Sequence, residues 1–482
     1  MNVAAHKQRP DLHPLERALL VALMVELLFL PWAFGSTRWW SQAIAATLAL
    51  IAFVLALWPR DYSGDLAVAG AFRLLAWPRL VRFVPFWVGV GLLALLLVQA
   101  FNPAWAYRAN TKVWWMERVP HVKWLPSSAT APFEIFDVWR AFIIYATVWL
   151  SICAAWVGLT RRRSLQLLLT ILGANAVLLA SVGFVHRMVG EPKLLWIWSV
   201  PGSYFASFVY RNHAGAYLGL LASVSLGLAL WYHFESRKRM ARSSPAPLWI
   251  LLTVVLFLAV LFSFSRGAAI TLAVFCASAV GAYFVLRSAN PTPSTMPRAV
   301  GVALTIVFAG ALFGILRYVD FDQIERRFLK LTEAGETSVT SRAAVRNVAW
   351  DMYTDHWVLG TGAGSFRYIF PTYLATHPDV PRGVWWDAAH IDWLEIPIEL
   401  GAPGVLLIGI GLGWCLVRFF RQAGWRHPIA FMIFLGCGQT MLHALIDFPF
   451  QNPAVLVTWA TLLVVALRWL ELETPERKAA PR

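Results

Sequence analysis

Three arginines in separate parts of the chain could together bind an anionic group. Arg211 begins the sequence Arg-Asn-His-Ala-Gly, Arg266 lies in Phe-Ser-Arg-Gly, and Arg342 follows a serine in a polar stretch. Guanidinium groups stay charged and hold phosphate oxygens through paired hydrogen bonds, so three of them suit a diphosphate better than a carboxylate. Arg346, one helical turn later, is a weaker candidate. Alternatively, the first two arginines snorkel to lipid headgroups and the other two lie on a solvated helix face.

His390 is the candidate catalytic residue. Its imidazole titrates near neutral pH and can take a proton from a hydroxyl group as a general base. Asp387, Asp392 and Glu395 are its acidic neighbours along the chain and could orient it. A surface histidine is uninformative by itself, so this assignment depends on the residues that the fold brings close.

Four other polar residues could support this chemistry. Asn212 and His213 follow the first of the arginines at the start of an apolar run, and polar groups there are costly in lipid unless they face a cavity or pathway. His443 and Asp447 are four residues apart near the end of another apolar run. They are interpreted either as a structural hydrogen-bonded pair or as a support for the catalytic group.

Two further patterns are not interpreted as functional sites. The sequence Gly360-Thr-Gly-Ala-Gly364 resembles part of a nucleotide-binding loop, but no strand precedes it and no P-loop lysine follows, which favours a simple turn. The possible metal ligands of the same stretch match no recognised spacing: His377, Asp379, Asp387 and His390. The sequence therefore predicts neither a metal nor a cofactor.

Long apolar runs surround these residues. Of the 482 residues, 59% are hydrophobic and only 14% are charged, a composition that excludes an ordinary soluble globule. Several runs approach the roughly 20 residues that cross a bilayer, which predicts an all-α polytopic membrane protein. Twelve spans are expected, near residues 16–35, 41–58, 85–101, 138–159, 164–185, 204–232, 247–264, 268–286, 299–318, 398–417, 428–446 and 454–470.

The basic residues indicate the orientation of these spans. The formal charge is +15, but it is spread over short clusters between apolar runs without a nucleic-acid-binding module, which argues against nucleic acid as a partner. By the positive-inside rule the clusters lie in the cytoplasm, so both termini are cytoplasmic and the long polar stretch lies in the periplasm of a bacterial inner-membrane protein. The clusters include Arg60, Arg73, Arg79 and Arg82, Arg161 to Arg163, Arg237 to Arg242, Arg418 to Arg426, and Arg468.

The chain is expected to have five parts. These are N-terminal spans in 1–200, central spans in 201–318, a large periplasmic loop in 319–398, C-terminal spans in 399–470 and a cytoplasmic tail in 471–482. Within the loop, one helix is expected from Ser341 to about His356 and a second from about Trp385. Residues 61–84 are expected to form a helix lying in the interface, and residues 102–136 an interfacial loop anchored by tryptophans.

Taken together, the motifs resemble the O-antigen ligase and polymerase superfamily over about residues 200–450. The resemblance depends on their order and membrane placement, since each motif is degenerate alone. The motifs are Arg211-Asn-His-Ala-Gly, Phe264-Ser-Arg-Gly-Ala, Ser341-Arg342 leading to Leu359-Gly-Thr-Gly-Ala-Gly-Ser-Phe366, and His390 through Glu399-Leu-Gly-Ala-Pro-Gly404.

The resemblance implies a GT-C-like membrane glycosyltransferase that takes glycan from a polyprenyl-diphosphate-linked donor without a nucleotide sugar. It implies diphosphate binding by Arg211, Arg266 and Arg342 and an essential role for His390. The chain departs from the family where members often have His-Asn, because His390 is followed by isoleucine and Asp392. Asp392 could supply the polar partner instead.

Several functions remain open at this point. The glycan, once released from the donor, is ligated to lipid A core, added to a growing chain or used in exopolysaccharide assembly, with membrane lipids and other polysaccharide-assembly proteins as further partners. A protein O-oligosaccharyltransferase is the runner-up. A lipid-glycan flippase or transporter is an alternative of another class, but it predicts two similar halves, and the sequence has no such repeat.

Overall fold

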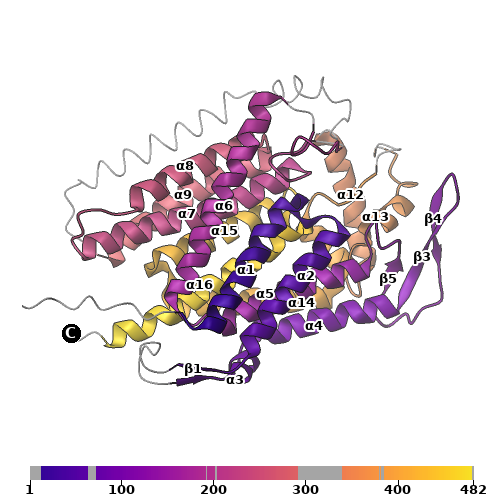
Figure 1. Ribbon diagram of the computed structural model, residues 1–482. Helices are drawn as coiled ribbons and strands as arrows, with labels where there is room; N and C mark the ends of the chain where they lie inside the picture. Colours follow the sequence, from indigo (N-terminus) through magenta and orange to yellow (C-terminus); the bar gives the residue numbers. More distant parts are fainter. Residues whose placement is uncertain are drawn as a thin grey trace, which may run out of the picture.

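The protein is a bundle of long helices that carries two small sheets (Figure 1). The computed structural model describes residues 12–62, 72–190, 193–200, 203–290, 339–378, 380 and 385–479, without the side chains of 339–342 and 474–479. The long helices of the bundle are α1 (Pro14–Trp32), α2 (Trp39–Leu57), α4 (Val84–Phe101), α5 (Val138–Gly158), α6 (Arg162–Val189), α7 (Arg211–Lys238), α8 (Ala246–Phe262), α9 (Arg266–Ala289), α14 (Asp392–Arg421), α15 (Pro428–His443) and α16 (Pro453–Ala479). The other helices are α3 (Ala76–Val81), α12 (Val339–His356), α13 (Phe366–Ile369) and the 3₁₀ turns η1 (Phe34–Ser36), η3 (Phe370–Tyr373), η4 (Gly424–Arg426) and η5 (Pro449–Gln451).

The helices confirm an all-α polytopic membrane protein. In the described part of the chain, eight helices are long and apolar enough to cross a membrane, and α8 and α15 are shorter apolar helices. Each predicted span that falls on described residues coincides with one long helix, although α7 begins at Arg211 rather than at residue 204. The predicted span at 299–318 lies outside the described residues.

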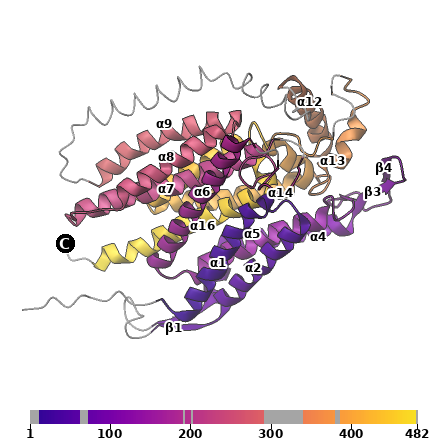
Figure 2. The ribbon, with the colours of Figure 1, turned by 45° about the horizontal axis from the view of Figure 1, so that its top comes forward.

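The bundle has two ends, and each is marked by a hydrogen bond between residues far apart in the sequence. At the first, Gln99 Nε2 of α4 donates to the carbonyl of Glu399 on α14 over 2.9 Å. At the second, Arg468 Nε of α16 donates to the carbonyl of Leu159, just after α5, over 2.9 Å. We call these the loop end and the tail end. Figure 2 shows α12 and α13 at the loop end and the C-terminus at the tail end.

At the tail end, the prediction of one helix across residues 61–84 was wrong. Strand β1 (Arg60–Tyr62) pairs antiparallel with β2 (Phe72–Leu74), and α3 is the helix among the described residues between β2 and α4. The buried Tyr62 fixes this hairpin because its hydroxyl donates to Glu16 Oε2 of α1 over 2.9 Å. Three-residue strands are too short to show a period in the sequence.

At the loop end, residues 102–136 form a three-stranded sheet that the sequence analysis missed. Strand β3 (Pro103–Ala109) lies between β4 (Trp114–Arg118), to which it is antiparallel, and β5 (Ser128–Thr130), to which it is parallel. The Trp114 ring of β4 lies edge-on to Trp385 with centroids 5.0 Å apart. The sheet therefore contacts the long polar loop.

The long loop is folded around α12. The predicted apolar stripe is confirmed: Val345, Val348, Ala349 and Met352 are all buried in one cluster. The predicted glycine turn after the helix is also confirmed, since Gly360 has a φ of 76° and its position leaves no room for a side chain beside the Glu399 carbonyl. A Cβ there would lie 2.4 Å from that oxygen.

The second loop helix begins later than expected. α14 starts at Asp392, because the Ala389 amide donates to Glu395 Oε2 over 2.7 Å and His390 has a φ of 55°, in the left-handed region. Neither feature fits a regular helix. α14 also breaks at Gly401, where φ is 62° and ψ is −174°, and the glycine turn packs against this break.

Candidate functional site

The His390 side chain lies in an aromatic pocket at the loop end. Its ring is edge-on to Phe448, with centroids 4.7 Å apart, and to Trp386, at 5.8 Å. Its Nδ1 atom lies 3.9 Å from Asp447 Oδ1, and its side chain is 13% exposed. A non-glycine residue at positive φ carries backbone strain that surrounding contacts must hold in place. The histidine is thus held in one orientation, with a carboxylate on its Nδ1 side.

The Asp447 carboxylate is fixed by the first turn of α7. Asn212 Nδ2 donates to Asp447 Oδ2, and the Phe448 amide donates to Asp447 Oδ1 over 2.9 Å. His213 Nε2 lies 3.2 Å from the Phe448 carbonyl. Three predicted supporting residues, Asn212, His213 and Asp447, therefore meet at the candidate catalytic histidine.

His443 does not form the predicted side-chain pair with Asp447. Their link is a backbone hydrogen bond of 3.0 Å from the Asp447 amide to the His443 carbonyl. Within the described residues, neither ring nitrogen of His443 has a hydrogen-bond partner. The ring packs instead against α9, where a Cβ at Gly267 would lie 2.7 Å from His443 Nε2. His443 thus joins the first turn of α9 to the end of α15.

Arg211 and Arg266 are the first residues of α7 and α9, and these two helix starts pack together. A Cβ at Gly215 would lie 2.6 Å from the Ala268 Cβ, so the glycine lets the two first turns approach closely. Arg211 is buried and Arg266 is exposed. Amide groups in the first turn give each helix N-terminus a partial positive charge. Two N-termini side by side therefore add to the positive charge of the two guanidinium groups. This arrangement suits an anion.

The other two predicted arginines are Arg342 and Arg346. The structure describes only the backbone of Arg342, whereas it also describes the side chain of Arg346. Arg342 lies in the first turn of α12, but its side chain is outside the described part. Arg346 lies one turn later on the same helix and is half-buried. Its Nε atom is buried and has no hydrogen-bond partner in the part of the chain that the structure describes. The predicted diphosphate role of Arg342 stays a prediction.

The acidic neighbours in sequence do not orient His390, so that expectation was wrong. Asp392 Oδ2 accepts the Phe450 amide over 2.9 Å, and Glu395 accepts the Ala389 amide and Gln451 Nε2. Asp387 lies 3.3 Å from Arg367 Nη1. All three carboxylates thus hold loop segments in place, because the change of direction at residues 389–392 turns them away from the ring.

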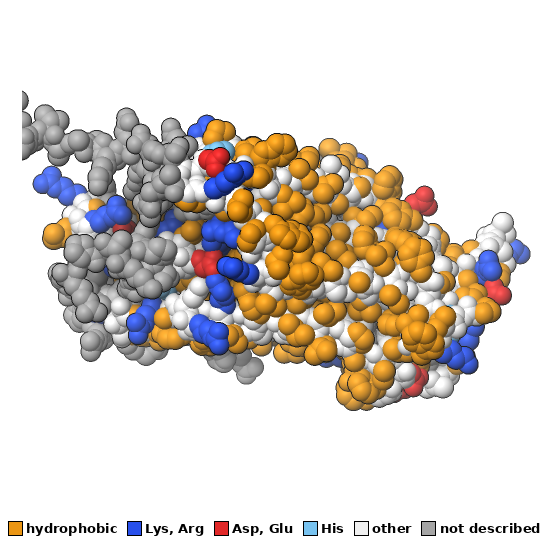
Figure 3. All heavy atoms as spheres, turned by 90° about the horizontal axis from the view of Figure 1, so that it is seen from below, with side chains coloured by type: hydrophobic (Ala, Val, Ile, Leu, Met, Phe, Trp, Pro, Cys, Tyr) orange, Lys and Arg blue, Asp and Glu red, His pale blue; other side chains and the backbone are white. Residues whose placement is uncertain are grey.

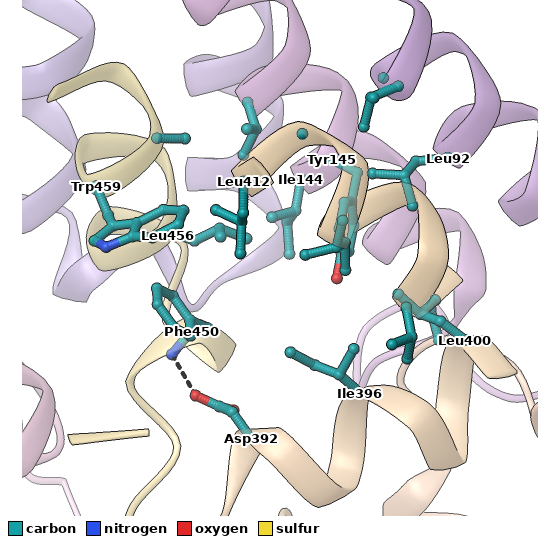
Figure 4. Close-up of a pocket in the computed structure, with 18 of the residues that line it drawn as sticks. Leu92, Ile144, Tyr145, Asp392, Ile396, Leu400, Leu412, Phe450, Leu456 and Trp459 are labelled. Atoms are coloured by element: carbon teal, nitrogen blue, oxygen red, sulfur yellow. Dashed lines mark hydrogen bonds between the residues drawn. The ribbon is translucent and has the colours of Figure 1, made fainter. Parts of the chain in front are cut away.

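An apolar cavity of about 360 Å³ opens beside the carboxylates of Asp392 and Glu399. Its walls come from α4, α5, α14 and α16, and its polar rim includes Asp392, Glu399 and Gln451. Figure 4 shows leucine, isoleucine and tryptophan side chains around the space and the bond from the Phe450 amide to Asp392 at one side. Asp392 Oδ1 is buried there and has no hydrogen-bond partner among the described residues. A cavity of this size and lining suits an apolar chain.

The sequence analysis missed three residues that build the site. Gln99 is fully buried, and its Oε1 accepts the Ala363 amide over 3.2 Å, which ties α4 to the glycine turn. Arg187 of α6 lies with its guanidinium carbon 4.9 Å from the Phe264 ring, beside the start of α9. The Tyr368 hydroxyl donates to the Phe136 carbonyl over 2.7 Å, and burial raises the pKa of Tyr368 to about 12. Their only sequence signal was polarity at the edges of apolar runs.

Comparison with known proteins supports the assignment of this region. The O-antigen ligase family model matches residues 251–409, a segment that includes Arg266, Arg342 and His390. No curated protein matches the chain. Residues 251–409 therefore match an O-antigen ligase domain, and this match supports the resemblance to the O-antigen ligase and polymerase superfamily that the motifs predicted.

Proposed function

We propose that this membrane protein transfers or polymerises glycan from an undecaprenyl-diphosphate-linked donor at the loop end, which faces the periplasm. The family match supports a membrane glycan ligase or polymerase in general. One observation carries the finer proposal. The first turns of α7 and α9, which begin with Arg211 and Arg266, lie next to the segment that places Asp447 beside His390.

The arginine pair would bind the donor diphosphate. Breaking the bond between the anomeric carbon and the diphosphate oxygen leaves negative charge on the departing group. Positive groups already in place around that oxygen lower the barrier, because they need no reorganisation during the reaction. Arg211, Arg266 and the two helix N-termini meet that need, and Arg342 would complete the set.

His390 would take the proton from the acceptor hydroxyl. The hydroxyl oxygen forms the new bond to the anomeric carbon on the face opposite the diphosphate, which inverts that centre. Asp447 would stabilise the protonated imidazole from its Nδ1 side. Their separation of 3.9 Å exceeds hydrogen-bond length, and such contacts often shorten only when substrate is bound.

The apolar cavity would hold the hydrocarbon chain of a lipid-linked substrate. It lies among membrane helices, and its rim reaches Asp392, two residues after His390.

The experiment is an assay with purified protein and undecaprenyl-diphosphate oligosaccharide. Products are separated by gel and identified by mass spectrometry, with His390→Ala as the comparison. Lengthened lipid-linked glycan that is lost in the variant identifies a polymerase. Donor consumed only with lipid A core, or only with a protein acceptor, identifies a ligase or an oligosaccharyltransferase. A donor left intact with every acceptor overturns the proposal and favours transport.

A further inference from the structure

A group of arginines gathers at the tail end, away from the candidate site. The Arg161 guanidinium carbon lies 5.3 Å from the centre of the Tyr62 ring. Arg79 of α3 and Arg468 of α16 lie near enough for their charges to repel, and Tyr62 and Glu16 interact electrostatically with both. Four separate elements of the bundle thus contribute to one charged region.

Positive charge exceeds negative charge in this region. Five arginines, Arg60, Arg79, Arg161, Arg418 and Arg468, surround two carboxylates, Glu16 and Glu471. Glu471 is shared by two arginines, with Arg468 Nη1 at 2.6 Å and Arg418 on the other oxygen. The pairs Arg73–Asp61 and Arg162–Glu473 at the border are neutral.

Glu16 does not compensate the excess by direct contact. Its oxygens accept the Thr160 amide at 2.9 Å, the Arg161 amide at 3.1 Å and Ser164 Oγ at 2.7 Å, so they cap the start of α6. No hydrogen bond or ion pair joins the guanidinium groups of Arg79 or Arg161 to any residue that the structure describes. Within the described part of the chain, these two arginines therefore have no carboxylate in contact.

The two unpaired arginines differ in access. Arg161 is only 8% exposed, and its three guanidinium nitrogens are covered. Arg79 is half-buried, with Nη1 covered. A buried charge without a partner is costly, and the cost falls when an anion sits nearby, because Coulomb attraction acts across several ångströms at low dielectric. The guanidinium group of Arg79 is therefore the one that can contact the anion directly, and the buried Arg161 adds electrostatic attraction.

Exposed tryptophans place this region at the level of lipid headgroups. Trp58, at the end of α2, and Trp77, on α3, are each 63% exposed, and Trp87, near the start of α4, is 52% exposed. Tryptophan collects at membrane–water interfaces. Figure 3 shows lysine and arginine side chains at both ends of a broad hydrophobic surface, including a group beside the grey atoms at the left. An anionic ligand that reaches Arg79 from the membrane surface would be a lipid whose negative charge lies in its headgroup.

We propose that Arg79, backed by Arg161 and Arg468, binds the phosphodiester headgroup of an anionic phospholipid in the leaflet at the tail end. Basic pockets between membrane helices on one side of a bilayer take such headgroups. The site lies at the opposite end from His390, so it is separate from glycan transfer. The bound lipid would join Arg79 of α3 to Arg468 of α16 and to Arg161, which directly precedes α6.

The test is lipid binding to the purified, delipidated full-length protein, followed by native mass spectrometry. The probes are phosphatidylglycerol, phosphatidylcholine, inorganic phosphate and glycerol phosphate. The variants are Arg79→Gln, Arg161→Gln and the matched control Arg73→Gln, which removes an exposed arginine of the neighbouring strand β2 that is already paired with Asp61. We expect the protein to bind one phosphatidylglycerol molecule more tightly than phosphatidylcholine. The affinity for phosphatidylglycerol should fall about tenfold in Arg79→Gln, the loss expected for one charge-assisted hydrogen bond. It should be unchanged in Arg73→Gln.

Three results overturn the proposal. The first is equal affinity for the anionic and the zwitterionic lipid. The second is an equal loss in Arg79→Gln and Arg73→Gln, which means only general surface charge matters. The third is that inorganic phosphate or glycerol phosphate displaces the lipid at equal concentration, which identifies a soluble anion as the ligand. If Arg161→Gln does not fold, Arg79→Gln decides the question because its side chain is partly exposed.

Discussion

His390 and Asp447 lie on different segments of the chain, yet Nδ1 of the histidine is 3.9 Å from Oδ1 of the aspartate. The histidine has a left-handed backbone before α14, and the aspartate follows α15. Asn212 of α7 holds the aspartate from the other side. The candidate catalytic pair thus depends on three helices packing correctly at the loop end.

His390→Gln should lower the transfer rate by about 10² to 10⁴ fold, the contribution of a general base. The glutamine keeps a polar side chain of similar length but cannot take the proton. His377→Gln is the matched control, because this second loop histidine is engaged with Asp351, at 3.2 Å. Initial rates with the lipid-linked donor measure both. Equal activity of the two variants would show that His390 is not the base.

Asp447→Asn should lower the rate about 10 to 100 fold, the usual cost of losing a group that orients a functional histidine. Asp387→Asn should stay close to wild type, although Asp387 is nearer to His390 in sequence, because it pairs with Arg367 instead. The same rate assay compares the two. The reverse order of effects contradicts the geometry described for the histidine.

Arg211→Lys and Arg266→Lys should each lower the rate by about 10² fold, since lysine keeps the charge but loses the paired hydrogen bonds to the diphosphate. The double variant should lose less than the product of the two single losses, because both groups bind one ligand. Arg108→Lys is the control, as Arg108 is exposed and paired with Glu117 at 2.7 Å. Strictly multiplicative losses would argue for separate roles.

Gly360→Ala should destabilise the loop end by about 1 to 3 kcal/mol, because a left-handed alanine is strained and its Cβ meets the Glu399 carbonyl at 2.4 Å. Gly409→Ala on α14 is the control, since nothing lies within 4 Å of a Cβ there. Thermal melting and limited proteolysis of the loop measure the difference. A Gly360→Ala protein as stable as the control contradicts the docking of the turn on α14.

Acid should weaken the long loop through His356. Burial, followed by a smaller effect of Arg118, lowers the pKa of His356 below 6.5, while Asp355 opposes the change. The unfolded loop therefore binds the proton more tightly, so this contribution to stability is full above the unfolded pKa and is lost as pH falls through and below about 6.5. Melting temperatures of wild type and His356→Gln between about pH 7.5 and pH 5 test this. The variant should show the shallower dependence, and identical slopes would exclude the histidine as the cause.

The sequence by itself determined the helices and most of the charged groups that matter. Apolar runs of membrane length give α4, α5 and α9 whatever their neighbours, because lipid leaves the backbone no other partner than its own helix. The arginines at 211 and 266 stood out for the same reason, as charges at the edges of such runs. The apolar period of α12 predicted which of its faces is buried.

The tertiary structure decided how these parts combine. Asp447 becomes the partner of His390 only because the start of α7 packs against the end of α15, and no local pattern encodes that contact. The strand at 60–62 is too short to show a period, and the strand at 103–109 has no regular alternation of buried and exposed residues, so both became visible only through their pairing. Among the described residues, no carboxylate contacts Arg79 or Arg161, because packing directs the oxygens of Glu16 and Glu471 to other donors.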